Sequence, residues 1–435
     1  MEGTGYRRHA RIHTKRGLDL LAKNITRFGF VVPILIDVTG AIIAGHARVS
    51  AAKRLGYQEL PALRLEHLSP IEVRALRLAD NRLAELSEWN KEVLAIELKD
   101  LIEFDFDVSL SGFESPQVDI LLNQQFPVIG STAADDMPPV QPGAPVTRLR
   151  DLWVLDEHRV LCGDACNSDH YQGLLGEVRP HAMFADAPYN IPVDGTISGA
   201  GRIKHREFVQ GSGEMSAAEY AAFISRFVAS ATGYTADGSV HFHCIDWRQL
   251  CLYEQACKPH YAAHLNTITW VKPNAGMGSL YRSQSEFVLA FRSGQSRHTN
   301  NIELGRHGRN RSNVWFYEGC NSINPARRRE LLLHPTPKPV EMIADAIRDV
   351  THRGQSVLDP FLGSGSTLIA CEKTERACFG IELDPLYVDV IVRRWQEHTG
   401  RKARHLNTGL TFDQTAESRG TVRLLPPPPL KTAEA

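Results

Sequence analysis

The strongest constraint on the fold is a short apolar run, residues 356–359, that leads through a glycine-rich turn into a helical stretch. Gly363 and Gly365 allow this turn to bring the backbone close to a ligand, at which the first amides of the helix point. About twenty residues further on, the strand-like run 377–382 ends in Glu382, where a carboxylate can bind a ribose diol. Both runs predict an α/β sheet with a nucleotide-like cofactor at the carboxyl ends of its strands. An ordinary strand-to-helix turn leaves the same glycine pattern, and the full Gly-x-Gly-x-x-Gly dinucleotide fingerprint is missing.

A second strand-like run, residues 181–185, ends in the tetrapeptide Asp186-Ala187-Pro188-Tyr189. Because Asp and Pro are common turn residues, a plain strand-to-loop turn explains the tetrapeptide equally well. The tetrapeptide also resembles the Asp-Pro-Pro-Tyr motif of amino-methyltransferases. That resemblance implies that Asp186 and the Ala187 carbonyl accept the two hydrogens of an exocyclic amine, and that Tyr189 stacks on the flipped base.

One position departs from the motif, because Ala187 stands where the family usually has proline. The carbonyl acceptor is kept, but the fixed φ of proline at this position is lost. By analogy with other proline substitutions, the ordering penalty is about 0.4–1 kcal/mol. We therefore expect slower turnover than in the proline-containing enzymes, without loss of activity.

Two further segments resemble cofactor-binding parts of the same enzymes. Residues 159–164 form a strand-like run ending in Gly-Asp, and the resemblance places Asp164 beside the adenine of the cofactor. Residues 334–339 resemble a His-Pro-Thr-x-Lys-Pro segment in which Lys338 lines the methionine end of the pocket, although a proline-rich turn before a helix is the simpler interpretation of this segment alone. The cofactor implied is S-adenosyl-L-methionine, with contacts expected from Asp164, Lys338, Asp359, Phe361, Gly363, Gly365 and Glu382.

The order of these motifs resembles the β class of N6-adenine and N4-cytosine DNA methyltransferases, because the tetrapeptide precedes the glycine loop. The resemblance covers residues 149–400, where strand-like and helical stretches alternate. It implies a Rossmann-like, mostly parallel sheet of seven strands with helices on both faces. Aspartate in the first tetrapeptide position favours N6 of adenine. The alternatives are an N4-cytosine enzyme and a ParB-like DNA-binding protein with a vestigial methyltransferase fold.

Target recognition is expected within residues 194–324, between the tetrapeptide and the glycine loop. Residues 305–313 combine basic and amide side chains, which suit phosphates and base edges of double-stranded DNA. We predict DNA contacts from Arg306, Arg309 and Arg311, although a solvated basic surface has the same composition.

The N-terminal block, residues 1–125, resembles the ParB/sulfiredoxin-like α+β domain through residues 28–30 and 44–56. The resemblance implies that Gly45 and Arg48 hold nucleotide phosphates at a helix start. A purely structural turn fits the same residues, and Ala47 replaces the usual second arginine. A proline-rich linker is expected at 126–148 and a flexible C-terminal tail at 401–435.

Composition adds little to these motifs. The net charge is −1, and the eight cysteines show neither Cys-x-x-Cys pairs nor zinc spacing, so we expect reduced thiols and no metal site. No apolar run approaches the ~18–20 residues needed to cross a membrane, and no signal peptide is evident. We expect a cytoplasmic protein, and the sequence leaves open whether it is a monomer or a homodimer.

Overall fold

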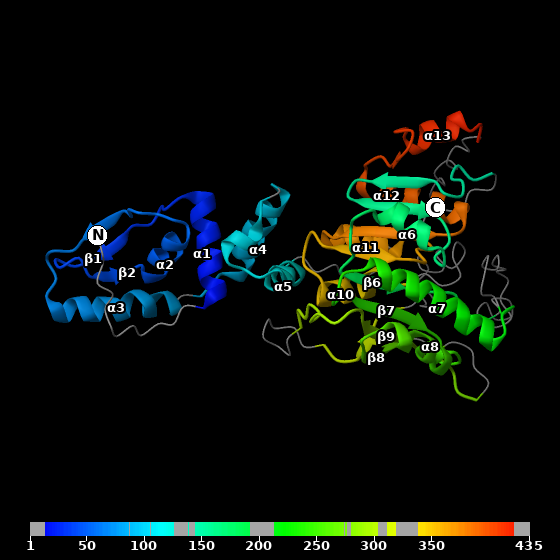
Figure 1. Ribbon diagram of the computed structural model, residues 1–435, viewed down its shortest axis with the longest axis horizontal. Coiled ribbons are helices and arrows are strands. Elements are labelled where there is room, and N and C mark those ends of the chain that lie inside the picture. The colour runs from blue at the N-terminus through cyan, green and yellow to red at the C-terminus, as the bar shows by residue number, and fades with distance from the viewer. Residues whose placement is uncertain are drawn as a thin grey trace, which may run out of the picture. The chain divides into compact units, whose positions relative to one another are not determined.

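The computed structural model describes residues 14–86, 88–104, 106–125, 138, 144–191, 213–273, 275, 280–302, 311–318 and 338–421. The chain divides into two compact units, Met1–Pro127 and Val128–Ala435, and each is described by itself (Figure 1). Over the described ranges, no helix combines the length and the apolar character needed to cross a membrane.

The first unit begins with a three-stranded sheet and three helices. Its sheet has the order β2-β1-β3, in which β1 pairs antiparallel with β2 and parallel with β3. Ser69 and Glu72 form a capping box at the start of the third helix, where a proline occupies the first turn. The elements are α1 (Lys15–Phe28), β1 (Ile34–Ile36), β2 (Ile42–Ala44), α2 (His46–Arg54), β3 (Ala62–Arg64) and α3 (Pro70–Glu85).

Shorter helices complete the first unit: α4 (Lys91–Glu103), η1 (Val108–Ser111) and α5 (Ser115–Gln125). They pack around Leu94, Leu98 and Val118, which form a small core of their own. Asn90 caps α4 by accepting hydrogen bonds from two amides of the first turn.

The second unit is built on one sheet, which has ten strands in the described residues. Their spatial order is β10-β8-β9-β7-β6-β11-β12-β5-β4-β13, and the five central strands from β7 to β5 are parallel to one another. In chain order the strands are β4 (Leu152–Leu155), β5 (His158–Cys162), β6 (Ala182–Ala185), β7 (Val240–Ile245), β8 (Ala263–Val271), β9 (Ser285–Arg292), β10 (Val314–Phe316), β11 (Ser356–Asp359), β12 (Ala377–Glu382) and β13 (Arg404–His405).

The predicted mostly parallel α/β sheet is confirmed, but it is wider than seven strands. Seven consecutive strands, β8 to β5 in spatial order, contain a single antiparallel member, β9. Strand β10 extends one edge, and β4 and β13 extend the other. The β4–β5 hairpin forms because Asp156 adopts a positive φ of 59° in the tight turn between them.

Residues 401–421 differ from the flexible tail that the sequence predicts from residue 401 onward. Strand β13 pairs with β4, and the helix α13 (Phe412–Ser418) follows it. The ring centres of Phe412 and Trp153 lie 5.2 Å apart, so an aromatic contact holds this segment against the sheet. The sequence prediction missed the segment because β13 is only two residues long.

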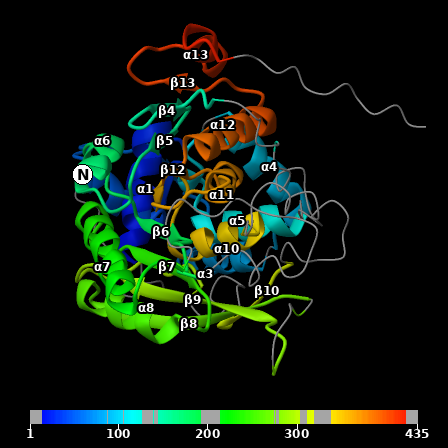
Figure 2. The ribbon, with the colours of Figure 1, turned by 90° about the vertical axis from the view of Figure 1, so that its right-hand side faces the viewer.

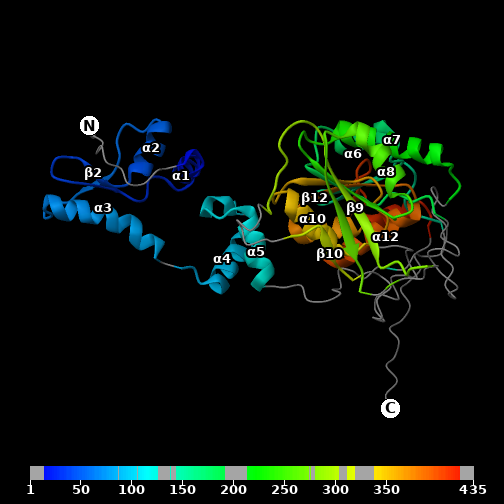
Figure 3. The same ribbon diagram turned by 90° about the horizontal axis from the view of Figure 1, so that it is seen from below.

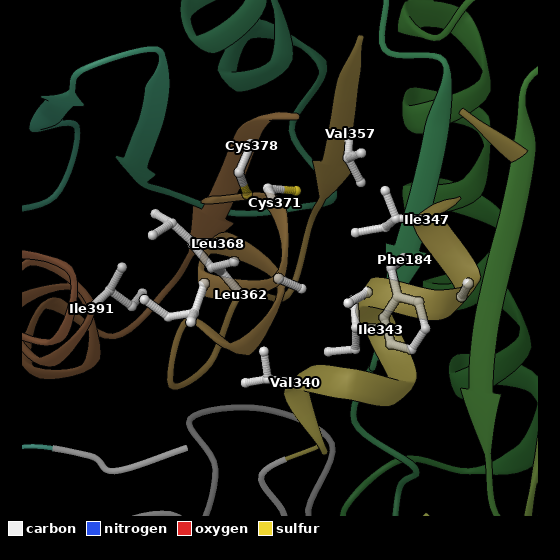
Figure 4. Packing of buried hydrophobic residues seen from close by; sticks show 14 of the residues in the cluster. Phe184, Val340, Ile343, Ile347, Val357, Leu362, Leu368, Cys371, Cys378 and Ile391 are labelled. Atoms are coloured by element: carbon white, nitrogen blue, oxygen red, sulfur yellow. The ribbon is translucent and has the colours of Figure 1, made fainter. Parts of the chain in front are cut away.

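Helices cover both faces of the sheet, as predicted (Figures 2 and 3). One face carries α10 (Val340–Val350), α11 (Ser366–Thr374) and α12 (Pro385–Thr399), whose apolar side chains share one buried cluster with Phe184 and Val357 of the sheet (Figure 4). The opposite face carries α6 (Ser168–Leu175), α7 (Ala217–Tyr234) and α8 (Leu250–Cys257), followed by the short η2 (Lys258–His260). Neighbouring residues of β6 alternate between the two cores, because Phe184 joins the first and Met183 the second.

Strands β6 and β11 position the site. They lie side by side and parallel, with Val357 opposite Ala182, although more than 170 residues separate them in the sequence. The carboxyl ends of adjacent parallel strands meet at one edge of the sheet, which is where ligands bind in open α/β folds. Asp186 and the glycine loop therefore come to the same edge.

A glycine in β12 should be essential for the packing of this edge. A Cβ at Gly380 would lie 2.3 Å from Cδ2 and 3.1 Å from Cγ of Leu362, which is buried in the core. We expect Gly380→Ala to lower the free energy of unfolding by about 1–3 kcal/mol because the buried leucine must move. Gly173→Ala in α6 is the matched control: its Cβ meets open space, so it should raise stability by about 0.4–1 kcal/mol. Urea unfolding of both variants measures the difference, and a Gly380→Ala protein as stable as wild type would contradict this packing.

Candidate active site

Both carboxylate oxygens of Asp186, directly after β6, receive hydrogen bonds from side chains. The Tyr189 hydroxyl donates to Oδ1 at 2.8 Å, and the Lys338 ammonium donates to Oδ2 at 2.7 Å. Lys338 stands two residues before α10, and its side chain is only 5% exposed. The structure thus joins two predicted site residues, 152 positions apart, in one buried ion pair.

A second carboxylate, that of Glu286 in β9, belongs to the same cluster and was not predicted. Its Oε1 accepts a hydrogen bond from Lys272, while its Oε2 lies 3.6 Å from the Lys338 nitrogen and 3.4 Å from the Tyr189 hydroxyl. A sequence signal existed: one acidic residue directly before the apolar run of residues 287–291. Acidic and basic side chains therefore alternate through the cluster, from Lys272 through Glu286 and Lys338 to Asp186.

Burial and charge set the ionisation of this cluster. Burial alone would lower the pKa of Lys338, but the carboxylates of Asp186 and Glu286 outweigh it and raise that pKa. Burial would likewise raise the pKa of Glu286, but Lys338 and Lys272 outweigh it and hold that pKa below its usual value. The pKa of Tyr189 is raised well above its usual value by burial and by the charge of Asp186. At neutral pH these shifts keep Lys338 as an ammonium, Glu286 as a carboxylate and Tyr189 as a neutral phenol.

The rest of the tetrapeptide is fixed by its surroundings. Ala187 is 1% exposed and packs in the core with Tyr220, whose hydroxyl donates to the Pro188 carbonyl at 2.9 Å. The Lys338 nitrogen lies 5.3 Å from the centre of the Tyr189 ring. An aromatic face, a carboxylate and a rigid turn therefore stand together at the end of β6.

Asn190 ends this turn in the left-handed region, at φ 54°. Its side-chain oxygen accepts hydrogen bonds from the amides of Gly213 at 3.2 Å and Met215 at 3.1 Å, and its amide donates to the Met215 carbonyl at 2.7 Å. These bonds tie the tetrapeptide to the segment before α7.

The loop after β11 forms the second part of the site. Gly363 and Gly365 have φ values of 54° and 85°, which favour glycine, as the sequence predicts. Asp359 accepts hydrogen bonds from the Thr367 hydroxyl at 2.5 Å and the Phe361 amide at 2.9 Å. Burial raises the pKa of Asp359 to about 7, and these hydrogen bonds only partly oppose it.

Glu382, at the end of β12, binds this loop directly. Its Oε2 accepts a hydrogen bond from the Gly363 amide and its Oε1 one from the Asp384 amide, both at 2.8 Å. Burial raises the pKa of Glu382 to about 7. Two backbone amides therefore orient its carboxylate, whose remaining lone pairs can accept bonds from a diol.

Asp164 comes to the same edge on the next strand. Strand β5 pairs in parallel with β12, and the Gly163 amide donates to the Glu382 carbonyl at 2.9 Å. Oδ1 of Asp164 accepts the Cys166 amide at 2.8 Å. The predicted cofactor residues thus follow β5, β11 and β12 in adjacent loops, and Lys338 reaches the end of β6 from the segment before α10.

Other predicted residues lie elsewhere. Arg306 and Arg309 are outside the described residues. The guanidinium of Arg311 lies 3.1 Å from Asp345 and 2.8 Å from Asp349, over the Trp315 ring, and is 17% exposed. These carboxylates raise the pKa of Arg311 and hold its side chain against α10, and the DNA contact of Arg311 stays a prediction. In the described ranges, no group of three or more His, Cys, Asp or Glu could hold a metal ion.

In the first unit, Gly45 and Arg48 form a structural turn at the start of α2. Gly45 has a φ of 102°, and a Cβ there would lie 2.8 Å from Cγ2 of Ile34. The Arg48 guanidinium donates to the carbonyls of Val32 at 2.8 Å and Pro33 at 3.0 Å. These contacts fasten α2 to β1, and a nucleotide site at this turn stays a prediction.

Comparisons with known proteins match both units. Residues 181–393 match the family model described as DNA methylase, and residues 92–149 match the ParB-methyltransferase HTH domain. The second match begins in α4 and includes the segment 126–148 that the sequence analysis assigned to a linker. The sequence analysis did not identify this helix-turn-helix domain.

Two individual relatives are named as type II methyltransferases. The chain is 25% identical over 250 residues to the type II methyltransferase M2.MboI of Moraxella bovis. This alignment covers 54% of this chain and 90% of that protein. It is 27% identical over 256 residues to the type II methyltransferase M2.LlaDCHI of Lactococcus lactis subsp. cremoris. This alignment covers 55% of this chain and 87% of that protein. A solved structure of the cytosine-N4-specific PvuII DNA methyltransferase aligns with a TM-score of 0.41 and 13% identity, covering 63% of this chain and 94% of that one.

The side chain of Asn190 should stabilise the turn that presents Asp186. We expect Asn190→Ala to lower the free energy of unfolding by about 2–4 kcal/mol, because it loses the side-chain hydrogen bonds and the local polar contacts that make asparagine more tolerant than alanine of the left-handed region. Asn190→Gly should recover about 1 kcal/mol of that loss, since glycine tolerates the positive φ. Chemical unfolding of both variants provides the measurement, and equal stabilities of the two would contradict the strained conformation.

Proposed function

We propose that this chain, which belongs through residues 181–393 to the N6/N4 DNA methylase family, methylates the exocyclic amine of a flipped base in double-stranded DNA. The methyl donor is S-adenosyl-L-methionine, and the acceptor we propose is N6 of adenine. The observation that carries this proposal is the position of Asp186, at the end of β6 and next to the glycine loop of β11.

The residues at the sheet edge fit this donor. Glu382 has both oxygens oriented by backbone amides and can accept the ribose hydroxyls. The positive φ values of Gly363 and Gly365 let the loop approach the cofactor closely. Asp164 offers a carboxylate for the adenine amino group, and Phe361 an aromatic ring beside it.

Asp186 addresses the chemical difficulty of the reaction. An exocyclic amine is a weak nucleophile because its lone pair is delocalised into the base ring. By accepting one hydrogen of the amine, with the Ala187 carbonyl accepting the other, Asp186 favours the pyramidal nitrogen that can attack. S-adenosylmethionine supplies a methyl group made electrophilic by its sulfonium. Asp186 can accept the proton that the nitrogen loses as the nitrogen–carbon bond forms and the sulfur–carbon bond breaks.

Tyr189 and the basic loop complete the proposed roles. Tyr189 stacks on the base after it leaves the duplex. Arg306 and Arg309 contact the DNA, and we give Arg311 the lesser part in this contact because it pairs with Asp345 and Asp349. The helix-turn-helix segment, residues 92–149, adds a second DNA contact, and we propose that the protein works in the cytoplasm.

We favour adenine over cytosine because aspartate occupies the first position of the tetrapeptide. N4 of cytosine presents an amine of the same geometry to the same acceptors. We assign the methyltransferase domain to residues 149–400, with target recognition within 194–324.

Methyl transfer from labelled S-adenosylmethionine to unmethylated duplex DNA, followed by nucleoside mass spectrometry, tests this function. We expect N6-methyladenine from the wild type and at least about 100-fold slower transfer in Asp186→Asn, which keeps the shape but loses the anionic acceptor. Asp169→Asn, an exposed aspartate in α6, is the control and should transfer at the wild-type rate. N4-methylcytosine as the product would show that the methyl acceptor is cytosine and not adenine. No product and no binding of S-adenosylmethionine would support the vestigial alternative.

Cofactor affinity should depend on pH through Glu382. Ribose hydroxyls bind the ionised carboxylate, and the pKa of Glu382 is about 7. The dissociation constant of S-adenosylmethionine should therefore be constant above pH 7.5 and rise by up to about tenfold per unit as the pH falls below 7.

Isothermal titration calorimetry between pH 5.5 and 8.5 measures this dependence. Glu382→Gln should bind more weakly and lose most of the pH dependence, and any dependence that remains belongs to Asp359, whose pKa is also about 7. A wild-type affinity that is constant down to pH 5.5 would refute the role of Glu382.

A further inference from the structure

The oxygens of Asp186 already have strong donors. Oδ1 accepts the Tyr189 hydroxyl at 2.8 Å, and Oδ2 accepts the Lys338 ammonium at 2.7 Å. An incoming amine must compete with both donors, and an ammonium is much the stronger competitor because its bond is charge-assisted. A paired ammonium also withdraws negative charge from the carboxylate and so makes it a poorer acceptor. The amine chemistry proposed above therefore requires another place for these donors.

Glu286 offers this place. Its Oε2 lies 3.4 Å from the Tyr189 hydroxyl and 3.6 Å from the Lys338 nitrogen, so one oxygen faces both donors of Asp186. A shift of about 1 Å would bring either donor to normal hydrogen-bond distance. The other oxygen, Oε1, accepts from Lys272, whose nitrogen lies 4.7 Å from the centre of the Trp270 ring. Glu286 is thereby fixed by one oxygen and available through the other.

We propose that Glu286 is a positioning residue that takes over the Lys338 ammonium and the Tyr189 hydroxyl when the target amine binds Asp186. The proposal rests on the amine-methyltransferase function proposed above. Glu286 does not touch the reacting atoms in this account. It acts by freeing the acceptor oxygens of Asp186 and by letting the Tyr189 ring turn to the base.

The charges of the cluster keep the free-energy cost of moving the Lys338 ammonium from Asp186 to Glu286 low. Two carboxylates, Asp186 and Glu286, face two ammonium groups, Lys338 and Lys272, so the net charge is zero. When Lys338 moves from Asp186 to Glu286, it stays paired in the buried site. Asp186 meanwhile exchanges an ammonium for the polar hydrogens of the amine. Without Glu286, release of Lys338 would leave a buried ammonium unpaired, which is strongly unfavourable.

A purely structural role for Glu286 makes a different prediction. If Glu286 only neutralises the charge of Lys338, its loss should lower stability without depending on the competition at Asp186. A double-mutant cycle between the two positions tests whether Glu286 acts on transfer through Lys338, and Glu286→Asp, which keeps the charge, separates positioning from charge neutralisation.

The experiment measures single-turnover methyl transfer, at saturating S-adenosylmethionine, for wild type, Glu286→Gln, Lys338→Met and the double variant. Glu286→Gln should slow transfer by about 10- to 100-fold, the value of one charge-assisted hydrogen bond. In the Lys338→Met background, where no ammonium competes for Asp186, the same substitution should slow transfer by less than about threefold. Cofactor affinity and melting temperature are measured for each protein. Glu254→Gln, in α8 and outside the site, is the matched control with the wild-type rate.

Glu286→Asp provides an independent variant with the charge kept. It shortens the side chain by one methylene, so the carboxylate should no longer reach both donors. We expect transfer at least about fivefold slower than wild type, whereas a charge-neutralising role predicts an unchanged rate. This variant decides the question if Glu286→Gln does not fold.

Equal slowing by Glu286→Gln in both backgrounds, or a wild-type rate in Glu286→Asp, would overturn the inference and leave the proposed function intact. A wild-type protein that binds S-adenosylmethionine but transfers no methyl group to DNA would overturn the proposed function, and this inference with it.

Discussion

The site depends on the parallel pairing of β6 with β11. These strands are remote in the sequence, and their pairing sets the end of one beside the end of the other. Asp186 follows β6 and Asp359 ends β11. The carboxylate proposed to accept a hydrogen bond from the target amine therefore lies at the same edge of the sheet as the cofactor loop. Two buried cores hold this arrangement, since helices pack on both faces of the central strands. A local turn alone could not bring these residues together, so every function proposed for this site depends on the pairing of β6 with β11.

At that edge, charge interactions rather than apolar packing stabilise the arrangement of the side chains. Lys272, Glu286, Lys338 and Asp186 form a buried series of alternating charge, and each charge is stable there because it has a partner. The carboxylates of Asp359 and Glu382 are different, since burial raises the pKa of both to about 7. The cofactor half of the site therefore responds to pH near neutrality.

Local patterns in the sequence predicted the parts of this site that depend on local geometry. The loop has positive φ at Gly363 and Gly365, and the two glycines in the sequence predict such a turn. The acidic residue Glu286 before an apolar run was visible in the sequence, but its place in the site depends on β9 pairing between β7 and β8, which local patterns do not show. The partners of Arg311 could not be predicted for a related reason: the sequence does not show that its guanidinium pairs with carboxylates on α10. The short strand β13 was missed because two residues carry no periodicity.

The most direct test of the central claim is a structure of the protein with target duplex DNA and a non-reactive analogue of S-adenosylmethionine. The decisive quantity is the distance between the target amine nitrogen and the nearer carboxylate oxygen of Asp186. Our account predicts about 2.7–3.2 Å, with the Lys338 nitrogen closer to Glu286 than to Asp186. A flipped base whose amine lies more than about 4 Å from Asp186, with Lys338 still on that carboxylate, would contradict it.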